Sequence, residues 1–416
     1  MVVVHPFKGL RPKPEYASRV ASPPYDVLSS DEARRLAAGD PLTYLHVEKP
    51  EIDLDPAIDL YDARVYAKGV ENFQKYINDG VFVQDAKPKL YFYRLTWRGQ
   101  SQLGLVACCA ADDYDQGRIL KHEFTRKDKE EDRTRYTYEL NANMGPVFFL
   151  YKAQAALNDL AARATAAPAV YDFQSADGVR NEFWVVDDDA LIAAIVAEFT
   201  KLPVVYVADG HHRTASGANV RAWKQKENPR HTGNEEYNFF MAVLFPHDQL
   251  RILDYNRVVK DLNGLTPIAF LKRVGEKFDV DPYVGAGVYR PEQTHAFGLY
   301  LDGRWYRLFA RQGTYDAGDA VARLDAAILQ ANLLTPILGI DDPRTSKRID
   351  FVGGIRGLEE LERRCREDGF ACALALFPVT VAELMAVADA GQIMPPKSTW
   401  FEPKLKSGLV AHLLSE

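Results

Sequence analysis

The segment Asp209-Gly210-His211-His212-Arg213 carries the strongest chemical signal in the sequence. Gly210 permits a tight reversal from a strand into a helix, and the first amides of such a helix lack partners and attract anions. The planar guanidinium of Arg213 suits phosphate oxygens, and His211 and His212 can donate to phosphate or move a proton near neutral pH. Asp209 can bind a metal or accept a proton. We predict an anion-binding or catalytic turn; the alternative is a structural turn with a buried histidine.

A second candidate group precedes a strongly charged stretch that begins at Lys121. Thr125, together with Asp128, is expected to cap a helix, and charges three and four residues apart then support one another. For residues 127–132 a solvated helix is the ordinary interpretation. A His122-Glu123 pair followed by threonine and Arg126 at a helix start suits phosphate and metal contacts, so a functional role stays open here.

The proline-rich N-terminal arm is a third candidate. Prolines fix the backbone and remove hydrogen-bond donors, so residues 1–30 are expected to be extended or turning. In Ser22-Pro23-Pro24-Tyr25-Asp26-Val27, rigid prolines can hold Tyr25 and Asp26 in fixed positions, as a binding loop requires. A cover strand without function is the alternative.

The C-terminal tail contributes Lys397, Ser398, Thr399 and Lys404 beside two adjacent prolines. Two ammonium groups and two hydroxyls could wrap an anionic ligand. The alternative is a set of solvated tail residues.

The predicted elements place the turn between a strand and a helix. Residues 204–207 are rich in valine and predict the strand that enters it, and residues 214–226 predict the helix that leaves it. Further strands are predicted at 90–97, 102–110, 145–151, 181–186, 237–245, 250–255, 296–301 and 304–310, and helices at 31–37, 59–79, 153–167, from Pro267, and at 319–333, 357–367 and 380–389. Because strands cluster in hairpins and one strand-turn-helix unit is clear, we predict an α+β fold with a mixed sheet.

Length and composition limit the classes of protein that fit. A chain of 416 residues is expected to form two or three domains. A formal net charge of −7 argues against nucleic acid as a partner. No apolar run approaches the roughly 18 residues of a membrane-spanning helix, so a cytoplasmic protein is expected. The four cysteines lack zinc-binding spacing and are interpreted as free thiols, and no known nucleotide-loop, metalloprotease or serine-hydrolase motif occurs.

Five motifs together resemble domain-of-unknown-function family 1015, in the order of that family and over nearly the whole chain. The motifs are Pro6-Phe7-Lys8-Gly9-Leu10-Arg11-Pro12, Ser22-Pro23-Pro24-Tyr25-Asp26-Val27, Lys121-His122-Glu123 with Thr125-Arg126, Asp209-Gly210-His211-His212-Arg213, and Met394-Pro395-Pro396-Lys397-Ser398-Thr399.

The chain also resembles the ParB/sulfiredoxin superfamily, through a Leu-Arg-Pro arm and a strand leading into Gly-His-His-Arg and a helix. Members of that superfamily place nucleotide phosphates at this turn, and some relatives are free-serine kinases. The resemblance implies a nucleotide-binding domain at 1–260 with an insertion at about 31–190. A C-terminal α+β domain, 261–416, would follow, with its tail returning to the site.

The leading hypothesis is a nucleotide-dependent kinase that phosphorylates a small hydroxyl metabolite, with free L-serine first, in serine metabolism. ATP or ADP and Mg²⁺ would be the cofactors. Two alternatives are a nucleotide-binding switch without transferase activity and a phosphate-ester hydrolase. The partners are then a nucleotide and a small molecule, without a membrane, and homodimer formation stays open.

Each candidate residue receives a role under this hypothesis. The catalytic candidates are Asp209, His211, His212, Glu123 and Asp26; the phosphate- or nucleotide-binding candidates are Gly210, Arg213, Thr214, Arg126, Lys397, Ser398 and Thr399; the substrate-binding candidates are Tyr25 and His122; and the metal ligands are Asp209 and Glu123. The sequence does not rank the carboxylates as the group that orients the acceptor hydroxyl.

Overall fold

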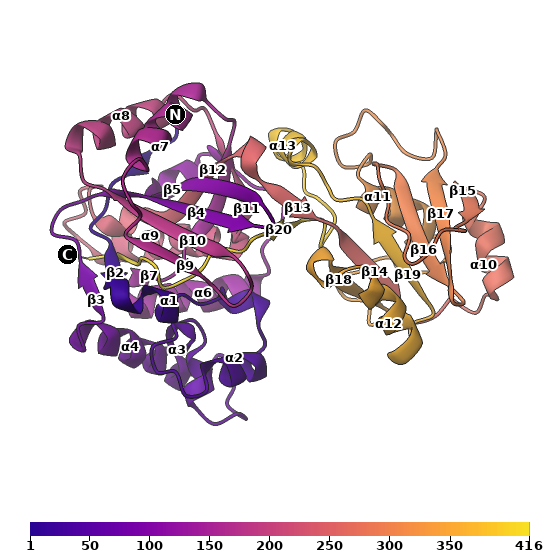
Figure 1. Ribbon diagram of the computed structural model, residues 1–416, viewed down its shortest axis with the longest axis horizontal. Coiled ribbons are helices and arrows are strands. Elements are labelled where there is room, and N and C mark those ends of the chain that lie inside the picture. Colours follow the sequence, from indigo (N-terminus) through magenta and orange to yellow (C-terminus); the bar gives the residue numbers. More distant parts are fainter. Residues whose placement is uncertain (416) are drawn as a thin grey trace. The chain divides into compact units, whose positions relative to one another are not determined.

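The computed structural model describes residues 1–415, which fold into two compact units. The first unit comprises residues 1–250 together with the segment that begins at Pro403, and the second comprises Arg251–Glu402. Figure 1 shows the yellow C-terminal segment running back among the indigo and magenta elements of the first unit. The sequence predicted two domains divided near residue 260. That each unit is an independent domain stays a prediction.

A nine-stranded mixed sheet forms the centre of the first unit, in the order β6-β11-β8-β12-β5-β4-β10-β9, with β1 paired to β5. The strands are β1 (Val4–His5), β4 (Leu90–Trp97), β5 (Gln100–Ala110), β6 (Ile119–Leu120), β8 (Val147–Tyr151), β9 (Tyr171–Gln174), β10 (Arg180–Val186), β11 (Val205–Asp209) and β12 (Phe239–Pro246). β11 runs parallel to β6, and β12 parallel to β8, whereas β11 and β8 are antiparallel. The predicted mixed sheet is therefore confirmed, and strands from within residues 31–190 lie in the same sheet as β11.

Two short ladders tie the chain ends into the first unit. They join β2 (Leu10–Pro12) to β3 (Phe82–Gln84), and β7 (Ala142–Asn143) to β21 (His412–Leu413). The second ladder fixes the C-terminal segment beside the helices that follow the N-terminal arm.

Helices cover the sheet of the first unit. They are α1 (Ala17–Val20), α2 (Ser30–Ala37), α3 (Leu45–Glu48), α4 (Ala63–Asn78), α5 (Ala111–Asp115), α6 (Lys127–Leu140), α7 (Ala155–Ala164), α8 (Asp189–Phe199) and α9 (His211–Glu227). Leucine, isoleucine and phenylalanine side chains of α7 and α8 pack with the sheet in one hydrophobic core, and α4 and α6 contribute to another. Figure 1 shows α7 and α8 together on one side of the sheet and α4 and α6 on the other. Within residues 1–415, no helix has both the length and the apolar character needed to cross a bilayer.

The second unit contains a six-stranded antiparallel sheet in the order β15-β17-β16-β19-β14-β18. Its strands are β14 (Tyr255–Val259), β15 (Phe278–Pro282), β16 (Ala296–Leu301), β17 (Arg304–Ala310), β18 (Ile349–Gly353) and β19 (Cys372–Leu376), and a separate ladder joins β13 (Arg251–Leu253) to β20 (Trp400–Glu402). The helices are α10 (Pro267–Val274), α11 (Asp325–Leu329) with a π-helical extension (Gln330–Leu334), α12 (Glu359–Glu367) and α13 (Val381–Asp389).

Several local expectations differ from the structure. Neither β9 nor α8 was predicted from the sequence. In α8, residues 190–196 are almost uniformly apolar and show no helical period. The helix expected at 319–333 begins only at Asp325, since the Asp319 carboxylate accepts from two following amides and holds the chain in a turn. Within residues 1–415, no side chain caps α6; Thr125 instead donates to Glu130.

Candidate functional site

The predicted strand-turn-helix unit is present as β11, Gly210 and α9. Gly210 is the N-cap of α9 and has a φ of 87°, a left-handed conformation that a side chain would strain. The helix begins at His211, earlier than the expected Thr214, so the two histidines and Arg213 lie in its first turn. The register of β11 against β8 shifts between Val207 and Asp209, and such a bulge redirects the side chain that follows it.

The Asp209 carboxylate lies at the end of β11 and is held on both oxygens. Oδ1 accepts from the Gly210 amide at 2.8 Å, and Oδ2 accepts from the Lys404 ammonium at 2.6 Å. Burial acts to raise the pKa of Asp209, but the charge and hydrogen bond of Lys404 outweigh it, so the pKa is lowered. Asp209 is therefore a carboxylate at neutral pH and is already neutralised by a lysine.

A small cavity that is open to solvent adjoins this ion pair. Its wall includes Asp26, Asp209, Gly210, Arg213 and Lys404. Surrounding protein atoms, and then the negative charge of Asp209, raise the pKa of Asp26, although the residue as a whole is exposed. The arrangement joins a carboxylate of raised pKa to two cationic side chains and a helix N-terminus.

Arg213 lines this cavity and is also held in place by hydrogen bonds to other protein groups. Its Nη2 donates to both carboxylate oxygens of Glu48, at 3.0 and 2.9 Å, and Nη1 donates to the Gly145 carbonyl at 3.3 Å. The Glu48 side chain is fully buried, whereas that of Arg213 is 15% exposed on the side of the cavity. The Tyr25 ring lies 5.0 Å from the Arg213 guanidinium and 4.5 Å from that of Arg133, which places the predicted substrate-binding tyrosine between two cations.

His212 is half-buried beside the segment that precedes α6. Its Nε2 accepts from the Arg126 amide at 3.0 Å, and burial lowers the pKa of His212. A neutral ring that accepts at Nε2 carries its proton at Nδ1, which is then available as a donor. The Arg126 side chain itself pairs with Asp128 at 2.7 Å, on the protein surface.

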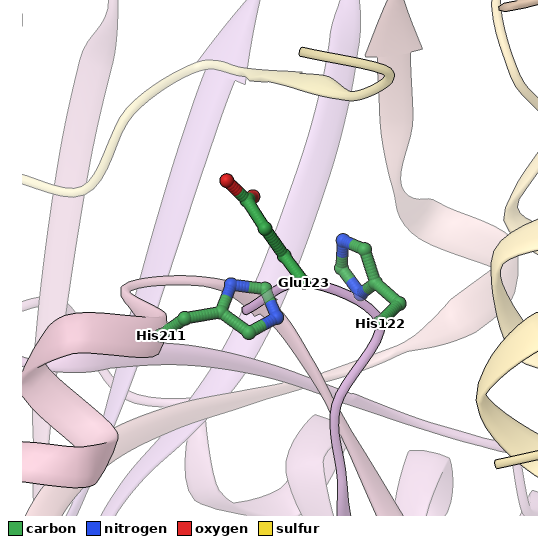
Figure 2. A group of neighbouring side chains, drawn as sticks. All are labelled: His122, Glu123 and His211. Atoms are coloured by element: carbon green, nitrogen blue, oxygen red, sulfur yellow. The ribbon is translucent and has the colours of Figure 1, made fainter. Parts of the chain in front are cut away.

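His122, Glu123 and His211 form a separate cluster, shown in Figure 2. Each offers one ligand atom, and these atoms lie within 4.8 Å of one another, so the three could hold a metal ion. Burial lowers the pKa of His122 to about 4 and that of His211 well below its usual value. Glu123 and His211 line a second small cavity, together with Thr125 and Thr214 among others.

The remaining predicted phosphate-binding residues make hydrogen bonds within the protein or lie in the second unit. Thr214 is buried, and its hydroxyl donates to the Gly210 carbonyl at 3.1 Å, which braces the turn. Lys397, Ser398 and Thr399 belong to the second unit, where Ser398 donates to the Pro395 carbonyl at 2.7 Å. Their predicted role at the phosphate site stays a prediction.

Sequence reasoning missed several residues that support the site. Glu48 gave no signal, because a single acid on a four-residue helix resembles a surface residue until its burial is known. Gly145 was read only as part of a strand, yet a Cβ there would lie 2.5 Å from Arg213 Nη1. Lys404 was grouped with the tail, and its pairing with Asp209 could not be inferred from residues separated by 195 positions.

Comparisons with known proteins give a family match and several remote structural likenesses. The model of a family described as "Protein of unknown function (DUF1015)" matches residues 4–327. No protein with a curated description matches the sequence.

Three similar solved structures illustrate the remote likenesses. A free serine kinase in complex with AMP is 10% identical with a TM-score of 0.36, over 72% of this chain and 86% of that one. A conserved hypothetical protein from Pyrococcus furiosus is 11% identical with a TM-score of 0.36, over 74% and 95%. SbnI with a C-terminal truncation, from Staphylococcus aureus, is 11% identical with a TM-score of 0.38, over 73% and 85%.

Proposed function

The chain belongs to the DUF1015 family, and we propose that this member binds a nucleotide at the α9 turn and transfers a phosphoryl group to the hydroxyl of a small metabolite. One observation carries the proposal: the cavity at the start of α9 brings Lys404, Arg213 and the N-terminus of α9 together with the Asp26 carboxylate. Phosphoryl transfer needs charge neutralisation and alignment more than covalent chemistry, and these groups supply both.

The charges around the cavity support a divalent cation as a companion of the nucleotide. Lys404 is paired with Asp209, and Arg213 with Glu48, while Asp26 adds a further carboxylate. A bare polyphosphate would therefore meet little net positive charge. Mg²⁺ carried by the nucleotide would offset this, with Asp26 and Asp209 as the carboxylates near enough to the cavity to contact it. Glu123, the other predicted magnesium ligand, lines the second cavity.

Asp26 is the carboxylate best suited to the acceptor hydroxyl. Asp209 is engaged on both oxygens by Gly210 and Lys404, whereas the raised pKa of Asp26 makes it the stronger proton acceptor. The hydroxyl oxygen would form a bond to phosphorus as the bond to the leaving phosphate breaks. The hydroxyl proton would pass to Asp26. His212 Nδ1 and the first amides of α9 would donate to phosphate oxygens.

Free L-serine is the first acceptor to test, as the ParB/sulfiredoxin resemblance implies. Purified protein would be incubated with ATP or ADP, Mg²⁺ and a panel of amino acids and hydroxy compounds, and phosphorus followed by NMR. A phosphorylated acceptor, formed by the wild type and lost in Asp26→Asn, is the expected result. Nucleotide binding without turnover of any compound would contradict a kinase and favour a switch. Release of phosphate from phosphoserine without a nucleotide would favour a hydrolase.

A further inference from the structure

We propose that His122, Glu123 and His211 form a binding site for a divalent transition metal ion such as Zn²⁺, Mn²⁺ or Fe²⁺. The site is distinct from the magnesium that would accompany a nucleotide. The site lies beside the second cavity and does not depend on the proposed phosphoryl transfer.

The three side chains come from two elements that the fold brings together. His122 and Glu123 lie in the segment before α6, and His211 is the first residue of α9. The rings of His122 and His211 meet edge to face, with centroids 4.6 Å apart and an interplanar angle of 86°. Figure 2 shows the Glu123 side chain extending between the two histidine side chains, and the ligand atoms of all three lie within 4.8 Å of one another.

The histidine nitrogens provide the second, independent observation. His122 and His211 are only 2% and 7% exposed. One ring nitrogen of His122 faces the Val207 backbone, which leaves the other ring nitrogen and Nε2 of His211 buried without a hydrogen-bond partner among the described residues. Polar atoms buried in proteins almost always have a partner, so two such nitrogens, one on each ring of the cluster, need an explanation. A metal ion coordinated by the rings satisfies them directly.

The donor set selects the class of metal. Magnesium and calcium prefer oxygen ligands, whereas imidazole suits zinc, iron and other transition metals, and two histidines with one carboxylate are a known donor set for such ions. Three protein ligands beside a cavity leave positions for water or a substrate oxygen, as in catalytic metal sites.

Metal binding can be measured on the full chain without nucleotide. Protein stripped with a chelator would be titrated with Zn²⁺, Mn²⁺ and Co²⁺ by calorimetry, with Co²⁺ also followed by its visible absorption. We expect one ion per chain for the wild type. His122→Asn and Glu123→Gln should each weaken binding at least about 10-fold, since even changes behind the ligands of metal sites cost that much. His231→Asn is the matched control, because His231 pairs with Glu235 outside the cluster and should leave the affinity unchanged.

A spectroscopic measurement on the wild type covers the case in which a variant fails to fold. X-ray absorption of the zinc-loaded protein should show two imidazole ligands and at least one oxygen ligand. An all-oxygen shell, no binding by the wild type, or equal affinity in folded His122→Asn and wild-type protein would overturn the proposal. Since no nucleotide is present, failure here leaves the proposed kinase activity untouched, and loss of phosphoryl transfer does not affect this result.

Discussion

The Lys404 ammonium donates a 2.6 Å hydrogen bond to Asp209 Oδ2, and so joins the C-terminal segment to the end of β11. The pair fixes Asp209 as a charged carboxylate and places a cation on the wall of the cavity at the start of α9. An incoming phosphate would compete with Asp209 for this ammonium group. The negative charge of Asp209 would therefore be less fully compensated when a ligand is bound.

Replacing Lys404 with methionine should weaken nucleotide binding by roughly 10- to 100-fold. A hydrogen bond to a charged group contributes about 1.5–3 kcal/mol, and about 1.4 kcal/mol corresponds to a factor of ten in affinity. The variant also leaves Asp209 without its lysine, which would repel phosphate. Calorimetric titration with ADP or ATP at two salt concentrations measures the effect, and the affinity of the variant should depend less on salt.

The control for this experiment is Lys406→Met. Lys406 lies in the same segment but pairs with Asp177, and it is absent from the cavity wall. An equal loss of affinity in both lysine variants would point to a displaced C-terminal segment and would count against a direct contact of Lys404 with phosphate.

Replacing Asp26 with asparagine should lower kcat at least about 100-fold while nucleotide affinity is kept or increased. General base catalysis typically contributes about 10²–10⁴-fold, and the substitution removes a negative charge near the phosphates. The base must be ionised, so wild-type kcat should fall as pH drops through the raised pKa of Asp26. Asp26→Asn should lose this acid limb of the pH–rate profile.

Asp31→Asn serves as the control for Asp26, because Asp31 is close in sequence but 80% exposed on α2. Its pH–rate profile should match that of the wild type. Retention of the acid limb in Asp26→Asn would assign the proton acceptor to another group and exclude Asp26 from that role.

Local signals in the sequence were sufficient for many of the elements. Alternating and aromatic apolar residues predicted β4, β16 and β17 with their observed bounds, and the predicted helix at 31–37 is present as α2, with Ser29 and Glu32 forming its capping box. The missed helix α8 is nearly all apolar between residues 190 and 196, so periodicity could not distinguish it from a strand.

The candidate site was predictable only where neighbouring residues act together. Gly210 and the residues after it form a turn whose backbone and side chains are contiguous, so its geometry followed from the sequence. The partners of that turn, Glu48 for Arg213 and Lys404 for Asp209, are distant in sequence and depend on tertiary packing. A charged residue in a sequence does not reveal whether it will be buried, and burial decides its role here.

The buried pair of Arg213 and Glu48 predicts that Arg213→Ala destabilises the first unit by about 3–5 kcal/mol, because the fully buried Glu48 carboxylate would lose its charged partner. Adding Glu48→Gln should recover part of this loss, with a coupling energy of roughly 0.5–3 kcal/mol. Urea unfolding followed by hydrogen exchange of peptides from α3 and α9 would report the change locally.

Comparing the single variants with the double variant also decides how an inactive Arg213 variant is interpreted. If the double variant regains stability but still fails to bind nucleotide, Arg213 contacts the nucleotide in addition to pairing with Glu48. Independent, additive effects of the two substitutions would show that the pair contributes nothing beyond its separate members, and the predicted coupling would be wrong.

Asp325 predicts a pH dependence of stability in the second unit. The residue is 5% exposed, Oδ1 accepts from the His295 amide at 2.7 Å, and Oδ2 has no hydrogen-bond partner among the described residues. Burial, with a smaller contribution from the charge of Glu383, raises the pKa of Asp325 to about 7. Because the folded state holds this proton more tightly than the unfolded chain, the associated stability is complete below about pH 4 and is lost as pH rises towards 7.

Asp325→Asn should therefore remove most of this pH dependence and make the second unit more stable than the wild type at pH 8. The difference between a pKa of 3.8 and one of about 7 sets an upper limit of about 4 kcal/mol. Urea unfolding at pH 5 and pH 8, followed by hydrogen exchange of peptides from α11, measures it. Asp281→Asn, at a side chain that is 57% exposed, should keep the wild-type pH dependence. Equal stability of the wild type at pH 5 and pH 8 would mean that the Asp325 carboxylate is solvated or paired when ionised.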